Sequence, residues 1–402
     1  MKAYMLAWLC ALALPAYAYE GADWAAWRGP RFDGTSAEKG WKSDWSAGSP
    51  KRLWKAKIGL GCSAFAVAQG RAFTMGNERG ADADAVYAFD AEKGTELWKH
   101  TYPCELDPKY YFGGPSATPV VDAGRVYTLS KFGHAFCLEA QSGKVVWQRN
   151  VMEDFKLERP TWGYAGSARI DGERLYLNVG TAGLCLEKAT GKTVWETGNQ
   201  AGGYSTPVLV KAGGKDAVAN FTAAGLTLLD RADGKQLAQH PWKTQYDCNA
   251  ADPLVLGDAF FISSDYGAGC ALVKLEGGAF KELWRNKAMS NHMNPCVLHE
   301  GLLFGGSGNI QGGALVCLDA ASGALKWSKD DFNGQGILAD GKVLYLTSKG
   351  LLVVFEAQGE AYKELGRTQA FGGTCYTAPV LSHGLLYCRN GEGDAVCFDL
   401  RP

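Results

Sequence analysis

Aromatic rings, amides and one acid gather in five short segments of this sequence, each just before an apolar, strand-like run. Such rings can stack on a ligand, and amides can fix its orientation by hydrogen bonding. Asp247 beside Asn249 is the acid–amide pair among them. The alternative is a water-filled channel mouth whose polar side chains form hydrogen bonds with neighbouring backbone groups. The candidate ligand-binding residues are Trp162, Tyr164, Tyr204, Asp247, Asn249, His292, Asn294 and Tyr376.

No short motif supplies a catalytic centre. The sequence has no G-x-S-x-G nucleophile turn, no Walker loop and no H-E-x-x-H. The acidic loop 77–84 lacks the regular spacing of a calcium loop, which favours a solvated loop. A metal site of Cys62, Cys375 and His292 has no short ligand spacing to support it. We therefore nominate no catalytic residue and no metal ligand.

A repeated turn must position these segments. An acid, a glycine four residues later and a tryptophan four residues after that recur at intervals of about 40–50 residues, the period of propeller blades. The acid can accept turn N–H groups, and the glycine supplies a positive φ. The tryptophan can bury its face against a neighbouring repeat, so we expect all three to be structural. Intact copies are Asp90-Gly94-Trp98, Glu139-Gly143-Trp147, Glu187-Gly191-Trp195 and Asp319-Gly323-Trp327.

One repeat, residues 115–148, reads as four antiparallel strands joined by tight turns. Degenerate or truncated copies begin at Asp230, Glu276, Glu356 and Asp399, which makes eight repeats. Eight such repeats predict an all-β fold, an eight-bladed β-propeller of four-stranded antiparallel blades. The eighth repeat, 374–400, stops after its third strand. We expect residues 52–55 to supply the fourth, with Trp54 replacing the missing tryptophan. This N-terminal strand would close the last blade and remove the exposed sheet edges.

The cysteines leave several pairings open. Eleven of the twelve remain if an N-terminal leader is removed, an odd number in a compartment that permits disulfides. Cys62 and Cys375 align in blades 1 and 8, where a disulfide would hold the ring closed by about 2–4 kcal/mol. Two other pairs are alternatives, Cys248 with Cys296 and Cys388 with Cys397.

The N-terminus reads as an export signal, with Lys2, an apolar run over 5–14 and Ala16-Tyr17-Ala18 as the cleavage site. The expected organisation is a signal peptide at 1–18, an N-terminal extension with a W-R-G-P motif at 19–50 and the propeller at 51–402. Cleavage near Ala18 predicts a periplasmic or secreted protein. The apolar run is too short for a transmembrane anchor. A formal net charge of −1 argues against nucleic acid as a partner.

The acid–glycine–tryptophan turn of these eight repeats resembles the tryptophan-docking repeat of pyrroloquinoline quinone (PQQ) enzymes and of the wider PQQ-like propeller family. The run Trp24-Ala-Ala-Trp27-Arg28-Gly29-Pro30 is similar to the opening of many secreted members. The resemblance covers nearly the whole mature chain. It implies the fold and leaves the function to sites carried on that fold.

Two subgroups of this family imply different functions. Quinoprotein alcohol dehydrogenases hold PQQ with calcium between a tryptophan and a disulfide of adjacent cysteines, whereas this sequence has no Cys-Cys pair and no C-x-x-C-H haem motif. Scaffolds of the outer-membrane assembly type, BamB, bind other proteins without a cofactor. Those scaffolds are lipoproteins, and the segment before Cys10 is a poor lipid-attachment site.

These observations favour a non-enzymatic binding or scaffold module, expected to be a monomer without a cofactor. Its partners would be envelope or secreted proteins, or a small ligand at the central funnel. The alternative is an oxidoreductase that uses PQQ and calcium in the same funnel. A carbohydrate-binding propeller is a further alternative, because Trp162, Tyr204 and Tyr376 could stack on sugar rings.

Overall fold

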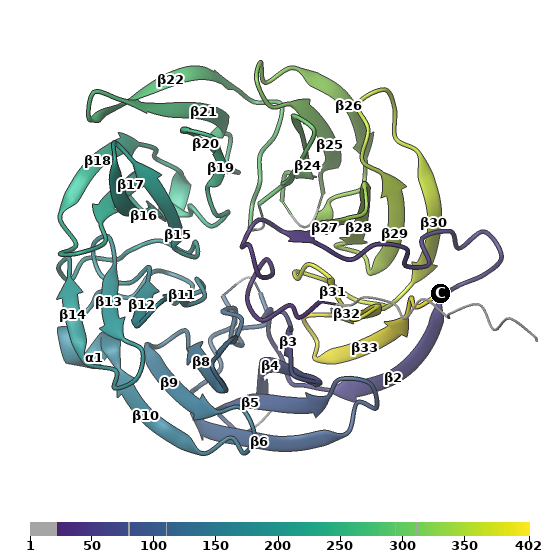
Figure 1. Ribbon diagram of the computed structural model, residues 1–402, viewed down its shortest axis with the longest axis horizontal. Coiled ribbons are helices and arrows are strands. Elements are labelled where there is room, and N and C mark those ends of the chain that lie inside the picture. Colours follow the sequence, from purple (N-terminus) through teal and green to yellow (C-terminus); the bar gives the residue numbers. More distant parts are fainter. Residues whose placement is uncertain (1–21, 79–80, 110, 294, 310–311) are drawn as a thin grey trace, which may run out of the picture.

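The computed structural model describes residues 22–78, 81–109, 111–293, 295–309 and 312–402. Eight sheets, each with four antiparallel strands, stand around a central axis as a closed ring (Figure 1). The predicted eight-bladed propeller is confirmed. No helix in these ranges is long and apolar enough to cross a membrane. The predicted signal peptide and Asn294 lie outside the described residues.

The first four blades follow one another along the chain, each running from an innermost to an outermost strand. Blade 2 is followed by the short helix α1 (Val151–Phe155), and blade 4 by the 3-10 turn η1 (Gln245–Asp247). Their strands are β3 (Ala66–Ala68), β4 (Arg71–Glu78), β5 (Ala83–Asp90), β6 (Glu96–Pro103); β7 (Val120–Asp122), β8 (Arg125–Leu129), β9 (His134–Glu139), β10 (Val145–Asn150); β11 (Arg169–Asp171), β12 (Arg174–Leu177), β13 (Leu184–Glu187), β14 (Thr193–Glu196); β15 (Val208–Ala212), β16 (Lys215–Thr222), β17 (Gly225–Asp230) and β18 (Gln236–Pro241).

The other four blades complete the ring, and two of them take a strand from the N-terminal region. These two strands are β1 (Thr35–Ser36) and β2 (Lys51–Lys57). The remaining strands are β19 (Leu254–Leu256), β20 (Ala259–Ser264), β21 (Gly269–Glu276), β22 (Ala279–Asn286); β23 (Val297–His299), β24 (Leu302–Ser307), β25 (Ala314–Asp319), β26 (Leu325–Asp330); β27 (Gly334–Ala339), β28 (Lys342–Thr347), β29 (Leu351–Glu356), β30 (Glu364–Gln369); β31 (Val380–Ser382), β32 (Leu385–Arg389) and β33 (Asp394–Asp399).

Burial explains the sequence of each strand. The middle strands are covered on both faces by neighbouring blades, so β5 is buried except at its last residue, and its middle, Ala85–Phe89, is an unbroken apolar run. The outermost strand β6 has one face in solvent, and from Trp98 on its side chains alternate between more buried and exposed positions. The hydrophobic core is therefore divided into layers between adjacent blades.

The ring closes where the sequence predicts. Strand β2 pairs antiparallel with β33, placing Lys51 opposite Asp399 and Lys57 opposite Asp394. Because β2 is the outermost strand of blade 8, its Trp54 takes the place of a repeat tryptophan. The first and last parts of the chain are thus joined in one sheet.

Each repeat tryptophan contacts the turn of the next blade. The Trp54 ring lies so close to Gly94 that a Cβ atom there would be 2.4 Å from it. Gly94 has φ +69, and its N–H donates to Asp90 O at 2.9 Å, which closes the turn. Trp54 Nε1 also donates to Ala91 O at 3.1 Å. The same ring-on-glycine contact joins Trp98 to Gly143, Trp147 to Gly191, Trp195 to Gly234 and Trp284 to Gly323.

The candidate disulfide between Cys62 and Cys375 is not formed. Both residues are free thiols, as are the other nine cysteines of the described ranges. Burial raises the pKa of Cys62 to about 11 and that of Cys375 to about 12, so both stay protonated at neutral pH. The ring is closed by β2 pairing and not by a covalent bond.

The N-terminal segment 22–50 crosses the middle of the ring and then runs out beside the blades of β27 to β33 (Figure 1). Trp24 forms a two-way backbone bridge with Val67 of β3. Further on, β1 adds to β27 as a parallel strand. Between these two points the segment places Trp27 and Arg28 in the central channel.

Candidate functional site

A tryptophan of the N-terminal segment forms the floor of the central funnel. Trp27 Nε1 donates to Asp252 Oδ2 at 2.6 Å. The neighbouring Arg28 is buried and donates to Pro295 O at 3.2 Å and Cys296 O at 3.0 Å. Since Asp252 and the two carbonyls lie just before β19 and β23, these contacts fix the segment to blades 5 and 6.

Hydrogen bonds from blade to blade hold the funnel wall above this floor. Each runs from a backbone N–H to a side-chain oxygen at the equivalent position of the next blade. They join Ala64 N to Thr118 Oγ1 at 3.0 Å, Thr118 N to Ser167 Oγ at 2.8 Å, Ser167 N to Thr206 Oγ1 at 3.0 Å and Thr206 N to Asp252 Oδ1 at 2.6 Å.

Asp252 is the acid at the bottom of the funnel. It is 7% exposed, and burial raises the pKa of its carboxyl to about 6, although Arg28 and the bonds from Thr206 and Trp27 favour the ionised form. Asp252 therefore changes charge in the mildly acidic range. Both of its oxygens already accept hydrogen bonds from the protein.

Five aromatic side chains form an arc along the funnel wall. Successive ring centroids are 5.9 Å apart for Tyr204–Trp162, 6.0 Å for Trp162–Tyr246, 5.7 Å for Tyr246–Tyr266 and 5.3 Å for Tyr266–His292, with the rings tilted or edge to face. Tyr266 and His292 are also joined by a hydrogen bond of 3.0 Å. Desolvation lowers the pKa of His292, so its ring is neutral at pH 7.

Two residues of this arc have a strained backbone. Tyr246 has φ +66 and Tyr266 has φ +59, a region that bulky side chains rarely adopt. Tyr246 is also 56% exposed although it is a large aromatic residue. Strain of this kind concentrates at ligand-binding sites, where the surrounding structure maintains it.

The arc, the floor and Tyr376 enclose a cavity of about 440 Å³. Four residues predicted from the sequence line it: Trp162, Tyr204, His292 and Tyr376. Tyr376 approaches the cavity from blade 8 and meets Phe112 edge to face at 6.0 Å. The cavity wall is thus mainly aromatic, with Asp252 at its base.

The structure places Tyr164 and Asp247 outside this cavity. Tyr164 is 1% exposed in the core between blades 2 and 3, and its hydroxyl donates to Glu158 O at 3.3 Å. Asp247 points to solvent, 3.5 Å from Lys243. The nearby η1 turn directs the ring of Tyr246, and not the Asp247 carboxylate, toward the funnel.

Asn249 is a structural residue. Its Nδ2 donates to Thr222 O at 2.8 Å and to Trp242 O at 3.0 Å, and its Oδ1 accepts from Ser264 Oγ at 2.9 Å. It is completely buried, so its amide supports the loop and does not face a ligand.

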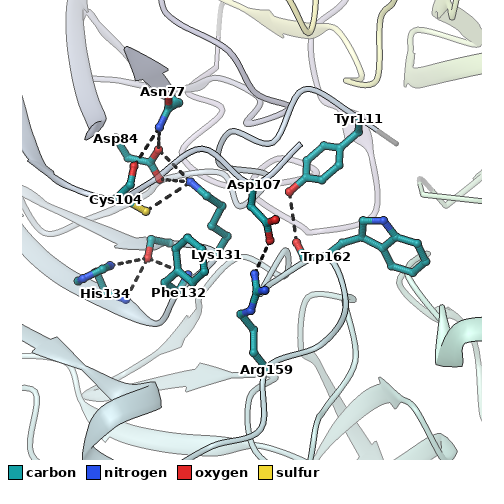
Figure 2. A network of polar contacts seen from close by, with 11 residues as sticks. Asn77, Asp84, Cys104, Asp107, Tyr111, Lys131, Phe132, His134, Arg159 and Trp162 are labelled. Carbon is teal, nitrogen blue, oxygen red and sulfur yellow. Dashed lines mark hydrogen bonds and ion pairs between the residues drawn. The ribbon is translucent and has the colours of Figure 1, made fainter. Parts of the chain in front are cut away.

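Two ion pairs, one fully buried and one partly buried, support the Trp162 side of the funnel (Figure 2). Lys131 Nζ lies 3.1 Å from Asp84 Oδ1, and both side chains are fully buried. Arg159 Nη1 donates to Asp107 Oδ2 at 2.5 Å, which ties the loop 104–116 to the loop that carries Trp162. Two hydrogen bonds complete the link between these loops. The Tyr111 hydroxyl donates to Trp162 O at 3.3 Å, and Trp162 Nε1 donates to Lys109 O at 2.9 Å.

Sequence reasoning missed several cavity residues. Trp27 was part of a motif read only as a family signature, and Tyr246 and Tyr266 lie in loops without a repeat pattern. Asp252 carried a readable signal, because it precedes Pro253 where Thr118 and Thr206 precede the prolines of blades 2 and 4. An acid at a threonine position of a repeat is a departure that can be found by aligning the blades.

The funnel does not fit PQQ with calcium. Calcium takes six to eight oxygen ligands, and the only carboxylate among the residues lining this cavity is Asp252, whose two oxygens are engaged. Nowhere in the described ranges do three His, Cys, Asp or Glu side chains come together as metal ligands.

Comparison with known proteins places the chain in a family. The family model described as "Outer membrane protein assembly factor BamB" matches residues 82–329, more than half of the chain. The chain belongs to the BamB family. BamB of Salmonella typhimurium (strain LT2) is 26% identical over 202 residues, which are 48% of this chain and 47% of that protein. The alignment thus spans about half the length of this curated relative.

Solved structures of a BamB and of a quinohemoprotein alcohol dehydrogenase share the fold of this chain. BamB from Moraxella catarrhalis superimposes with a TM-score of 0.65 at 14% identity, covering 87% of this chain and 100% of that chain. A quinohemoprotein alcohol dehydrogenase from Comamonas testosteroni gives 0.67 at 13% identity, covering 94% of this chain and 80% of that chain. At these identities the likeness shows the propeller fold alone.

Proposed function

We propose that this member of the BamB family is a non-enzymatic binding module of the cell envelope, whose funnel holds a segment of a partner protein. The observation that carries the proposal is the continuous aromatic arc around a cavity closed by the chain's own Trp27. Tyrosine and tryptophan are enriched at protein interfaces because they give large contact area and lose little side-chain entropy. The module works without PQQ or a metal ion.

The cavity dimensions support a peptide segment as the ligand. About 440 Å³ can hold one or two large side chains, and the arc offers ring faces and edges together with the Tyr hydroxyl groups. The strained Tyr246 and Tyr266 are already in place before binding, so little conformational entropy is lost when the partner enters. The assembly role named for the Salmonella relative is consistent with a protein ligand.

Site-specific photocrosslinking in the native cell tests this proposal. A photoreactive phenylalanine replaces Tyr246, and the control position is Leu325, which is 51% exposed on the outermost strand β26. We expect a discrete crosslinked protein from position 246 only, and its loss when Trp162→Ala is added. The same set of crosslinked proteins from both positions would contradict a funnel site.

Titration of the purified chain separates the alternatives. PQQ with calcium, and separately a set of neutral oligosaccharides, are added while the melting temperature is followed. We expect no saturable shift with either. A PQQ-dependent shift lost in Asp252→Asn would replace the proposal with an oxidoreductase, and an oligosaccharide shift lost in Trp162→Ala would replace it with a carbohydrate-binding propeller.

A further inference from the structure

The N-terminal segment covers the innermost strand edges of only part of the ring. In each blade, the second-to-last residue of the innermost strand directs its N–H away from the second strand, since the neighbouring pairs exchange the ladder bonds. In three blades this N–H donates to the segment: Val67 to Trp24 O at 2.8 Å, Val121 to Ala25 O at 2.7 Å and Leu338 to Gly34 O at 2.9 Å.

The equivalent residues of blades 4, 5 and 6 are not covered in this way. Among the described residues, the N–H groups of Lys211, Val255 and Leu298 have no backbone partner outside their own sheets. All three residues line a cavity of about 540 Å³, and Val255 is 40% exposed although it is apolar. Strand β15, with five residues, therefore presents an open edge beside a groove.

This groove is separate from the funnel. Funnel residues precede the innermost strands, whereas the groove is lined by the strands themselves and by the turns after them, such as Gly213 and Gly257. The two cavities share no lining residue. A ligand in the groove would therefore leave the aromatic arc free.

Arg169 supplies an unmatched positive charge to the groove. Its Nε and Nη1 are buried and make no hydrogen bond within the described part of the chain, and its guanidinium lies 3.3 Å from the ring centre of Phe32. Burial and the nearby Arg231 lower its pKa to about 10, so it is cationic at neutral pH. Other charged lining groups are already paired: Arg31 with Asp33 at 3.2 Å, Lys211 with Asp216 at 3.2 Å and Asp258 with Lys274 at 2.9 Å.

We propose that this groove binds an extended acidic segment of a partner protein, which adds as a strand to the open edge of β15 and places a carboxylate on Arg169. The chain itself shows the mode of binding, because Thr35–Ser36 adds to β27 in the same position of blade 7. Apolar side chains of Val210, Leu254 and Leu275 line the groove and can receive alternate side chains of the segment. This site is additional to the proposed funnel and does not depend on it.

Fluorescence anisotropy with a designed peptide tests the proposal. The probe is a fluorescein-labelled hexapeptide of alternating valine and glutamate, titrated with the mature chain. We expect saturable binding, at least tenfold weaker with Arg169→Gln, and none with the valine–lysine peptide. Absence of binding up to millimolar chain would overturn the proposal.

A matched pair of variants tests the strand addition. Lys211→Pro removes the outward N–H without removing a ladder bond to β16, and Lys211→Ala removes the side chain but keeps that N–H. We expect at least tenfold weaker binding for the proline variant and near-normal binding for the alanine variant. If Lys211→Pro does not fold, N-methylation of the probe on its pairing edge gives the same test from the ligand side.

Two outcomes would point elsewhere. Equal binding to both Lys211 variants and to the N-methylated probe would overturn strand addition. A labelled dodecanoic acid that binds through Arg169, in the absence of peptide binding, would identify the groove as a site for an anionic amphiphile.

Discussion

The outer rim and the funnel use tryptophan in opposite ways. On the rim, Trp54 is 7% exposed and packs its ring on Gly94, a contact that recurs from blade to blade. In the funnel, Trp162 contacts Tyr204 and Tyr246 and follows no repeat. The rim residues are therefore interchangeable parts of a scaffold, whereas the funnel residues are individual. In this chain, repetition indicates a role in stability, and departure from the repeat indicates a place to look for a ligand.

Removal of a rim tryptophan gives the largest expected effect. Trp54→Ala takes away a buried ring stacked near Phe65, Phe89 and Tyr387, and it leaves Ala91 O without its indole donor. We expect a loss of about 3–5 kcal/mol in the free energy of unfolding. Urea denaturation followed by tryptophan fluorescence and circular dichroism measures it. A loss below about 1 kcal/mol would remove the distinction between rim and funnel.

The buried Asp84–Lys131 pair is an exception to this contrast. It does not recur from blade to blade, and yet its surroundings are those of a structural contact. Lys131→Met leaves the Asp84 carboxylate buried without its cation, although Asn77 Nδ2 still donates to it at 2.7 Å. We expect a loss of about 3–4 kcal/mol.

The double variant Lys131→Met with Asp84→Asn tests whether the uncompensated charge of Asp84 causes this loss of stability. Because the uncompensated charge is then removed, the double variant should recover at least half of the loss in a double-mutant cycle. Losses that simply add would mean that the pair does not act through charge compensation.

The fold was predictable because its signal is repeated. The acid–glycine–tryptophan turn, the four-strand reading of each repeat and the closure by Trp54 all depend on local rules that recur along the chain. One such rule is the glycine with positive φ where the next ring must approach. Where one copy of the repeat is degenerate, the intact copies still show its spacing, so the architecture can be predicted from the whole set.

The candidate site was only partly predictable, because it is assembled from segments that do not repeat. Position before an innermost strand identified Trp162, Tyr204, His292 and Tyr376, but the same rule selected Asn249, which is bonded within its own loop. Which way a loop side chain points depends on backbone turns that the sequence pattern does not specify. The floor also required the N-terminal segment to cross the channel, and spacing along the chain gives no sign of that path.

The funnel acid gives a pH-dependent effect of intermediate size. The pKa of Asp252 is raised from 3.8 to about 6 on folding, so the folded state holds a proton that the unfolded state releases. Its contribution to stability is therefore fully present below about pH 4 and is lost as the pH rises through about 6. The shift corresponds to a change of up to about 3 kcal/mol.

Urea denaturation between pH 4 and pH 7.5 tests this sign. The difference in unfolding free energy between the wild type and Asp252→Asn should fall across that range and then level off. Trp27→Phe removes a donor that favours the ionised carboxylate, so it should move the transition to higher pH. A difference that stays constant with pH would show that Asp252 is ionised throughout.

The smallest expected effect on stability belongs to the funnel tryptophan, and it is the one that completes the comparison. Trp162→Ala should cost less than about 1 kcal/mol, because the ring lies on a loop at the mouth of the cavity and outside the core. Tyr164→Ala, two residues away, should cost several times more, since Tyr164 is buried against blade 2. The crosslink from position 246 should show the reverse order, lost in Trp162→Ala and retained in Tyr164→Phe. Equal loss of stability in the two alanine variants would mean that Trp162 is one more structural ring, and that the funnel lacks the individual character on which a binding site depends.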